Sequence, residues 1–161
     1  MKEVIRDILK RLSDVTGLAY VSADWGQLTM EQPPVEWPCA LVEVTVPAYV
    51  TSSVELQEAR AVVSVTLADY IDAGISPYML TEEYEQEMRI YAIIDRVHDV
   101  LQGLNTRGYS PLVRSSTRKT KAVPGVRAFV VEYETQWTDE AVRAELSPVR
   151  PDVEVNVSFK K

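Results

Sequence analysis

The chain has 161 residues, 46% of them hydrophobic, and a formal net charge of −7. This length and apolar content fit one folded domain and exclude wholesale disorder. An acidic chain gains little from phosphate contacts, on which nucleic-acid affinity rests, or from an anionic membrane surface. We therefore expect no membrane partner and no sequence-specific nucleic-acid partner.

The sequence carries few of the parts that targeting, disulfide or zinc chemistry requires. No apolar run approaches the roughly 20 residues that span a bilayer, and charges interrupt the start of the chain where a signal peptide is apolar. We expect synthesis in the cytoplasm. Cys39 and His98 are the single cysteine and the single histidine, so neither an internal disulfide nor a cysteine-based zinc site can form. Cys39 lies among strand-like apolar residues and is interpreted as a buried, inert thiol.

The first half of the chain predicts a helix and two strands. Apolar residues recur at helical spacing over residues 3–16, and Gly17 follows as a stop signal. The proline-rich residues 22–38 predict a loop that Trp25 and Trp37 anchor to the body. Alternating residues predict strands over 39–46 and 59–69, and Pro47 marks either the end of the first strand or a sheet edge. The connection between these strands suggests an antiparallel pair.

The second half predicts a long helix and two more strands. Thr81 suits the N-cap of a helix over residues 81–104, with an apolar stripe formed by Ile90, Ile93, Ile94, Val97, Leu101 and Leu104. Residues 112–119 and 126–137 predict strands. The order helix, strand, strand, helix, strand, strand predicts an α+β fold in which two main helices pack on one face of an antiparallel sheet. We expect residues 1–137 to form this single domain.

Residues 138–161 are interpreted as a C-terminal extension. Thr138 begins a predicted short helix that reaches residue 146, and Pro148 and Pro151 then impose an extended link. The period of two that follows predicts a terminal strand, with one apolar side formed by Val153, Val155, Val157 and Phe159. This strand could return to its own sheet or add to the sheet of a neighbouring copy, and the sequence leaves both open.

Charged side chains form two further candidate sites for protein contact. Basic residues gather around the last predicted hairpin, namely Arg114, Arg118, Lys119, Lys121 and Arg127. Acidic residues crowd the start of the long helix, where they complement the helix dipole, namely Glu82, Glu83, Glu85 and Glu87. The basic hairpin is either a solubilising tip or a contact for DNA phosphates or an acidic protein. A contact between the two sites in neighbouring copies would be head-to-tail and would form a ring.

The sequence contains no recognisable pattern for catalysis, a cofactor or a metal. It lacks a glycine-rich phosphate loop, a His-Glu-x-x-His motif and a Gly-x-Ser-x-Gly motif. His98 lies at the edge of the helix stripe and is interpreted as structural, because a general base needs a positioned partner. Glu132 and Glu134 lie about 7 Å apart by strand geometry, a spacing that suits paired-acid chemistry, but without a pocket beside them we interpret them as part of an exposed strand face. We expect no enzyme activity and no cofactor.

The order of the predicted elements resembles that of the phage tail terminator and tail-completion (head–tail joining) proteins. The stretches that carry the resemblance are residues 5–12, 37–44, 63–67, 93–101 and 129–133. They share a pattern of elements with that family, not a signature motif, over about residues 1–137. The resemblance implies a structural protein that assembles in the host cytoplasm and enters the virion. It implies a ring of identical subunits that ends tail-tube polymerisation and binds the head connector.

A second interpretation is a small α+β module, unrelated to phage, that binds a ligand or a protein. Trp25, Trp37 and Tyr70 are the residues around which we would expect its pocket. A deep pocket with polar lining would favour this interpretation, whereas a large and discrete oligomer would favour the ring.

Overall fold

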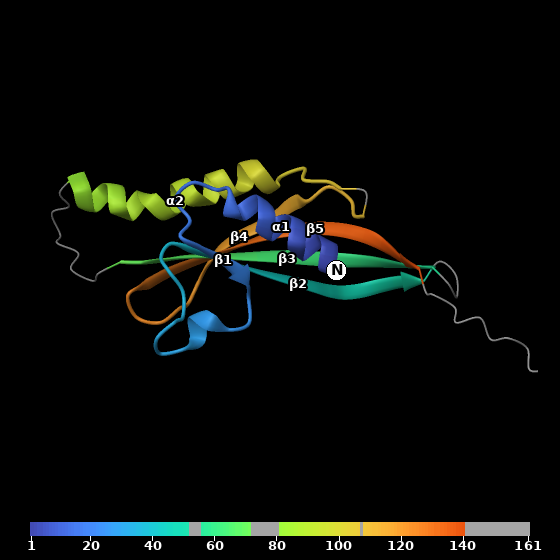
Figure 1. Cartoon of the computed structure of the whole chain (residues 1–161), viewed down its shortest axis with the longest axis horizontal. Helices are drawn as coiled ribbons and strands as arrows, with labels where there is room; N and C mark the ends of the chain where they lie inside the picture. The colour runs from blue at the N-terminus through green and yellow to red at the C-terminus, as the bar shows by residue number, and fades with distance from the viewer. Residues whose placement is uncertain (52–55, 72–80, 107, 141–161) are drawn as a thin grey trace, which may run out of the picture.

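The computed structural model describes residues 1–51, 56–71, 81–106 and 108–140. Helices α1 (Lys2–Ser13) and α2 (Thr81–Leu101) lie on the same face of a five-stranded sheet (Figure 1). The strands are β1 (Tyr20–Ala23), β2 (Cys39–Thr51), β3 (Leu56–Tyr70), β4 (Val113–Thr120) and β5 (Val126–Glu140). A short 3-10 helix, η1 (Gln27–Thr29), lies between β1 and β2. The predicted α+β class and the placement of both helices on one face are confirmed.

The strands lie in the order β1-β2-β3-β5-β4. The pairs β2–β3, β3–β5 and β5–β4 are antiparallel, as predicted, whereas β1 runs parallel to β2. Strand β1 includes Ser22 and Ala23, which were predicted to be loop, so that prediction is wrong. Its four residues are too few to show an alternating pattern in the sequence. The described sheet therefore has β1 at one edge and β4 at the other.

The main core lies between the helices and the sheet. Alternate residues of β3 and β5 face the helices, as predicted, and are buried, among them Ala61, Val63, Val65, Leu67, Val131 and Tyr133. Helix α1 contributes Val4, Ile8 and Leu12, and α2 contributes Ile90, Ile93, Val97 and Leu101. Burial of each large aliphatic side chain contributes about 1.5–3 kcal/mol. The buried side chains on the helix-facing side of the sheet therefore stabilise the fold.

A buried ion pair fixes the first half of α2 to the end of β3. Asp69 is fully buried, and both of its carboxylate oxygens accept hydrogen bonds from Arg89, at 2.8 Å from Nε and 2.7 Å from Nη2. Although 44% of the Arg89 side chain is exposed, its guanidinium reaches the sheet. Loss of one partner would leave the other charge uncompensated. The pair therefore sets the position of α2.

Several element boundaries differ from the predicted ones; α1, for example, ends at Ser13 instead of residue 16, and β3 begins at Leu56 instead of residue 59. Strand β2 continues through Pro47 by way of a bulge between Thr45 and Ala48. Helix α2 ends at Leu101, before the predicted residue 104, because Gly103 adopts a left-handed conformation with φ 74°. Strand β5 continues to Glu140, which pairs with Leu56 of β3. The prediction of a helix start at Thr138 is therefore wrong, and the rest of that predicted helix lies outside the described residues.

The loop between β1 and β2 covers part of the opposite face of the sheet. Trp37 packs there over a small buried cluster of Cys39, Ala68 and Ala128. Cys39 is fully buried, which confirms the predicted burial, and burial raises the pKa of its thiol to about 12. Trp25 is 58% exposed, so the prediction that it anchors the loop is wrong. The remainder of this face is called the open face below.

Candidate protein-interaction surface

Strand β4 forms an exposed edge of the sheet, called the β4 edge here (Val113–Thr120). Among the described residues, β5 is its neighbouring strand on one side, and no strand lies on the other. All of its side chains are exposed or half-buried. A bulge lies between Arg114 and Ser116, and the pairing is regular from Ser116 to Thr120. The outer side therefore presents backbone N–H and C=O groups that can pair with another chain.

The predicted basic residues flank this edge on both faces of the sheet. Arg118 lies opposite Val130 on the open face, whereas Arg114 and Lys119 lie opposite Tyr133 and Phe129 on the helix-facing side. Lys121 is exposed in the turn that follows β4. The structure therefore divides the predicted basic cluster between two faces, because adjacent residues of a strand point in opposite directions.

The carboxylate of Glu132 accepts hydrogen bonds from two side chains of the β4 edge. Ser116 Oγ donates to it at 2.6 Å, and Arg118 Nη2 donates at 3.3 Å. The Ser116 hydroxyl, and then the Arg118 guanidinium, hold the pKa of Glu132 below its usual value. A general acid is usually tuned to a raised pKa, which is opposite to the direction of the shift at Glu132. Its neighbour Glu134 is exposed.

One side of α2 overlies β4 and β5. The Tyr91 ring meets the edge of Phe129 at 5.3 Å between centroids, and His98 stacks on Tyr133 at 6.4 Å. Further along, Gln102 Oε1 accepts a hydrogen bond from the backbone N–H of Arg114 at 3.0 Å. The contact with Tyr133 agrees with the structural role predicted for His98.

The same side of α2 continues toward the start of the helix as an exposed apolar line. Tyr84, Met88 and Tyr91 follow at helical spacing of four and three residues, and their exposed fractions are 55%, 42% and 44%. We call these three residues the α2 stripe. A contiguous apolar group on a surface is typical of a protein contact.

The predicted acidic site lies at the same end of the molecule as the turn between β4 and β5 (Figure 1). Glu82 and Glu83 belong to the first turn of α2, and Glu85 is exposed. The Asp69–Arg89 ion pair and the pairing of Tyr70 with Val126 bring these segments together. A contact between the basic and acidic sites of neighbouring copies stays a prediction.

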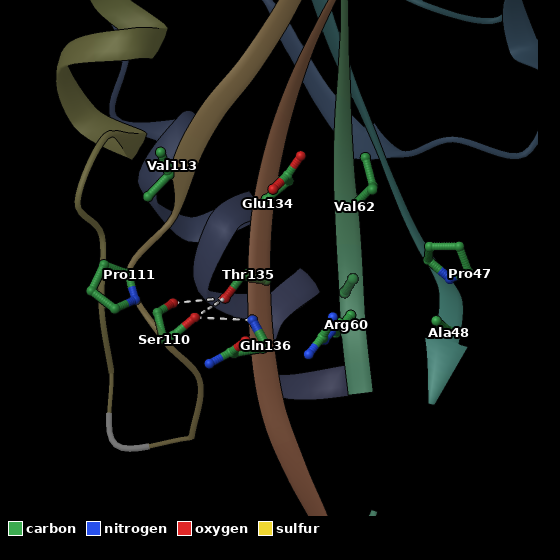
Figure 2. Close-up of a pocket in the computed structure, with 11 residues that line it drawn as sticks. Pro47, Ala48, Arg60, Val62, Ser110, Pro111, Val113, Glu134, Thr135 and Gln136 are labelled. Carbon is green, nitrogen blue, oxygen red and sulfur yellow. Dashed lines mark hydrogen bonds between the residues drawn. The ribbon is translucent and has the colours of Figure 1, made fainter. Parts of the chain in front are cut away.

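A groove of about 670 Å³ crosses the open face at the other end of the sheet (Figure 2). Its lining comes from β2, β3, β5, the loop before β4 and the first residue of β4, and includes Pro47, Arg60, Val62, Pro111, Val113 and Glu134. Ser110 fixes one wall: its backbone N–H donates to the carbonyl of Gln136 at 2.8 Å, and its hydroxyl accepts from the Gln136 N–H at 3.0 Å. Hydrogen bonds thus hold one wall of the groove in place, and its lining combines apolar and charged side chains.

This groove is distinct from the pocket predicted near three aromatic residues. Trp37 and Tyr70 lie 6.4 Å apart between ring centroids, and Trp25 is exposed. None of the three lines the groove. The prediction of a pocket beside them gains no support from this groove.

Two kinds of feature are absent from the described parts of the chain. Over these residues, no three His, Cys, Asp or Glu side chains are grouped so that they could hold a metal ion. Likewise, no helix there has both the length and the hydrophobicity needed to cross a membrane.

Four predicted interface residues lie outside the described residues, namely Val153, Val155, Val157 and Phe159. The α2 stripe and the groove were not predicted. A sequence signal for the α2 stripe did exist: Tyr84, Met88 and Tyr91 recur at helical spacing, away from the main apolar stripe of the helix. The groove is assembled from segments far apart in the sequence, and no local pattern indicates it.

The fold is similar to that of a chain in the structure "Virion of native gene transfer agent (GTA) particle". The TM-score is 0.55 with 14% sequence identity, and the match covers 84% of this chain and 92% of that chain. No protein-family model matches the sequence. No curated protein matches it either. At this identity the likeness shows a shared fold.

Proposed function

We propose that this chain is a structural protein of a phage or a phage-like particle. The observation that carries the proposal is the fold shared, over 84% of this chain, with a chain of a gene transfer agent virion. The order of helices and strands supports it independently, because it resembles that of tail terminator and tail-completion proteins. The β4 edge and the α2 stripe are features suited to contact with other proteins.

Within that class, we propose the role of a tail terminator or head–tail joining protein. Copies of the chain would form a ring at the head-proximal end of the tail, end the polymerisation of the tail tube and bind the head connector. A sheet edge that meets a different surface of the next copy makes a heterologous contact, and such contacts form a ring when the rotation between copies closes. The chain would assemble in the host cytoplasm, remain in the virion and carry no enzyme activity.

Immunogold electron microscopy tests both levels of this proposal. Antibodies raised against the purified chain would be applied to particles released by the organism that encodes it. We expect label at the junction between head and tail. Label elsewhere on the particle would support a virion protein and reject the head–tail junction, whereas particles that lack the chain by mass spectrometry would contradict the whole proposal.

The groove favours a second candidate function, a module that binds a peptide or a small ligand. Its volume of about 670 Å³ falls within the range of ligand sites, roughly 300–1,000 Å³. Arg60 and Glu134 offer opposite charges beside apolar Val62 and Val113. A ligand screen by thermal shift should then find compounds whose effect is lost in Arg60→Ala and kept in Lys10→Ala, a variant in α1. Equal effects in both variants would reject the groove as the site.

A further inference from the structure

We infer that the β4 edge accepts an added strand, and that this strand is residues 152–159 of a second copy of the chain. The inference rests on the proposed function, because it names the contact that joins neighbouring copies. Added strands gain affinity from backbone hydrogen bonds and register from alternate side chains. Both kinds of contact must therefore be available at the acceptor.

The β4 edge is a better acceptor than the other open stretch of the sheet. Strand β1 pairs only with Cys39–Val42, so the described residues leave the outer side of β2 without a neighbour from residue 43 to residue 51. That stretch contains Pro47, which has no N–H to donate, and a bulge. It also contains Glu43 and no basic residue. The β4 edge has no proline and pairs regularly over residues 116–120.

The charges of the two segments are complementary. Residues 152–159 include Asp152 and Glu154 and no basic residue, whereas the β4 edge includes Arg114, Arg118 and Lys119 and no acidic residue. If the valines of the added strand face the helices, Glu154 faces the open side, where Arg118 lies. Arg118 already contacts Glu132, but 57% of its side chain is exposed, and its guanidinium has five N–H donors. It can therefore bind a second carboxylate.

The α2 stripe provides the apolar counterpart. Tyr91 contacts Phe129, and Phe129 lies opposite Lys119 of β4, so the Tyr91 end of the stripe lies above the helix-facing side of this edge. A strand added beside β4 would point every second side chain toward that side. In residues 152–159 these positions are Val153, Val155, Val157 and Phe159. Their burial would cover aromatic and methionine surface that is exposed in the single chain.

The course of β5 favours a second copy as the donor. Glu140 lies six positions beyond Glu134, the partner of Val113, so β5 ends about 20 Å past the start of β4. To reach its own β4, the chain would have to reverse direction and return over that distance. Pro148 and Pro151 favour extended backbone in the last part of the link. Docking on a neighbour needs no reversal, and each copy would then give one strand and receive one.

Cysteine crosslinking between full-length chains tests the inference. One preparation carries Thr117→Cys on β4, and a second, with a different tag, carries Val155→Cys. The native Cys39 is fully buried, so a short bismaleimide should leave it unmodified. After mixing, we expect a crosslinked product that contains one chain of each kind. The matched control replaces the β4 site with Thr45→Cys on the outer edge of β2, and it should give no such product.

Each other outcome overturns the inference. A crosslink that forms only within single chains carrying both Thr117→Cys and Val155→Cys would show that the donor is the chain itself. Two results would show that the β4 edge is not the acceptor. One is no crosslink at β4, either in the particle or in the concentrated chain. The other is a crosslink at the Thr45 site. If gold label marks the head–tail junction while the crosslink fails, the proposed function stands and this contact does not.

A pair of donor variants provides a second readout. Val155→Asp places a charge on the side that we expect to be buried, and Asn156→Asp places the same charge on the open side. We expect Val155→Asp to lower the average mass of the chain in light scattering at least twofold, and Asn156→Asp to leave it unchanged. Equal masses for both variants would contradict the predicted orientation, provided that circular dichroism shows the same melting temperature.

Discussion

The helix-facing side of β3 and the β4 edge differ in their surroundings, although both strands pair with β5. On the first, Val63, Val65 and Leu67 are fully buried under two helices. On the second, Val113 is 54% exposed, and the charges of the edge lie in reach of solvent. Residues of the helix-facing side, called the covered side below, should therefore determine the free energy of unfolding. Residues of the edge should leave that free energy nearly unchanged and determine how copies assemble.

The largest expected effect comes from a cavity in the covered side. Leu67→Ala removes a fully buried side chain and should lower the free energy of unfolding by about 3 kcal/mol. Chemical denaturation measures this change. The matched variant at the edge, Val113→Ala, should change it by less than about 0.5 kcal/mol. Similar losses in both variants would abolish the distinction between the two regions.

A smaller effect is expected at the ion pair that holds α2. Arg89→Met leaves the buried Asp69 carboxylate without its bidentate partner and should cost about 2 kcal/mol, below the usual range for buried pairs because Arg89 is 44% exposed. The double variant with Asp69→Asn should recover part of the loss. A double-mutant cycle in urea gives the coupling energy. A coupling near zero would mean that the pair does not position the helix.

Glu132 gives a pH-dependent effect that is smaller again. Its pKa is lowered in the folded chain, so its contribution is present above the ordinary pKa of about 4.5 and is lost as the pH falls through the lower folded value. Glu132→Gln should remove about 0.5 kcal/mol at pH 7 and nothing once the carboxyl is protonated. Urea titrations at several pH values test this. A loss that is the same at all pH values would point to packing.

Charge reversal at the β4 edge should have the smallest effect on stability and a clear effect on assembly. Arg118→Glu with Lys119→Glu exchanges two exposed charges and should shift the melting temperature by no more than a few degrees. The average mass in light scattering should fall. The control is Lys2→Glu with Lys10→Glu in α1. Unchanged oligomerisation of the β4 variant would reject a role for these charges.

Periodic patterns made most of the covered side predictable. Alternation in β3 and β5 and the helical spacing in α2 identify the buried residues, because one face of each element must leave water. Gly103 also indicated the end of α2, because glycine commonly ends helices in a left-handed conformation. The prediction overlooked this residue. Strand β1 is too short for a pattern.

The interaction surface was harder to predict because it depends on contacts between distant segments. Asp69 and Arg89 lie in different elements, and neither their burial nor their pairing follows from local sequence. The basic residues were recognised as a cluster, but the placement of Arg114 and Arg118 on opposite faces depends on the bulge between Arg114 and Ser116. The residues of the groove come together only when four strands and a loop are in place.

Hydrogen–deuterium exchange of the β4 amides tests the central claim most directly. In the separate chain, outward-facing amides of residues 113–120 should exchange fast, while those of β3 beneath the helices should be protected. On incorporation into a ring or a particle, we expect the β4 amides to become strongly protected and the β3 amides to change little. Equally fast exchange at β4 before and after assembly would contradict the account.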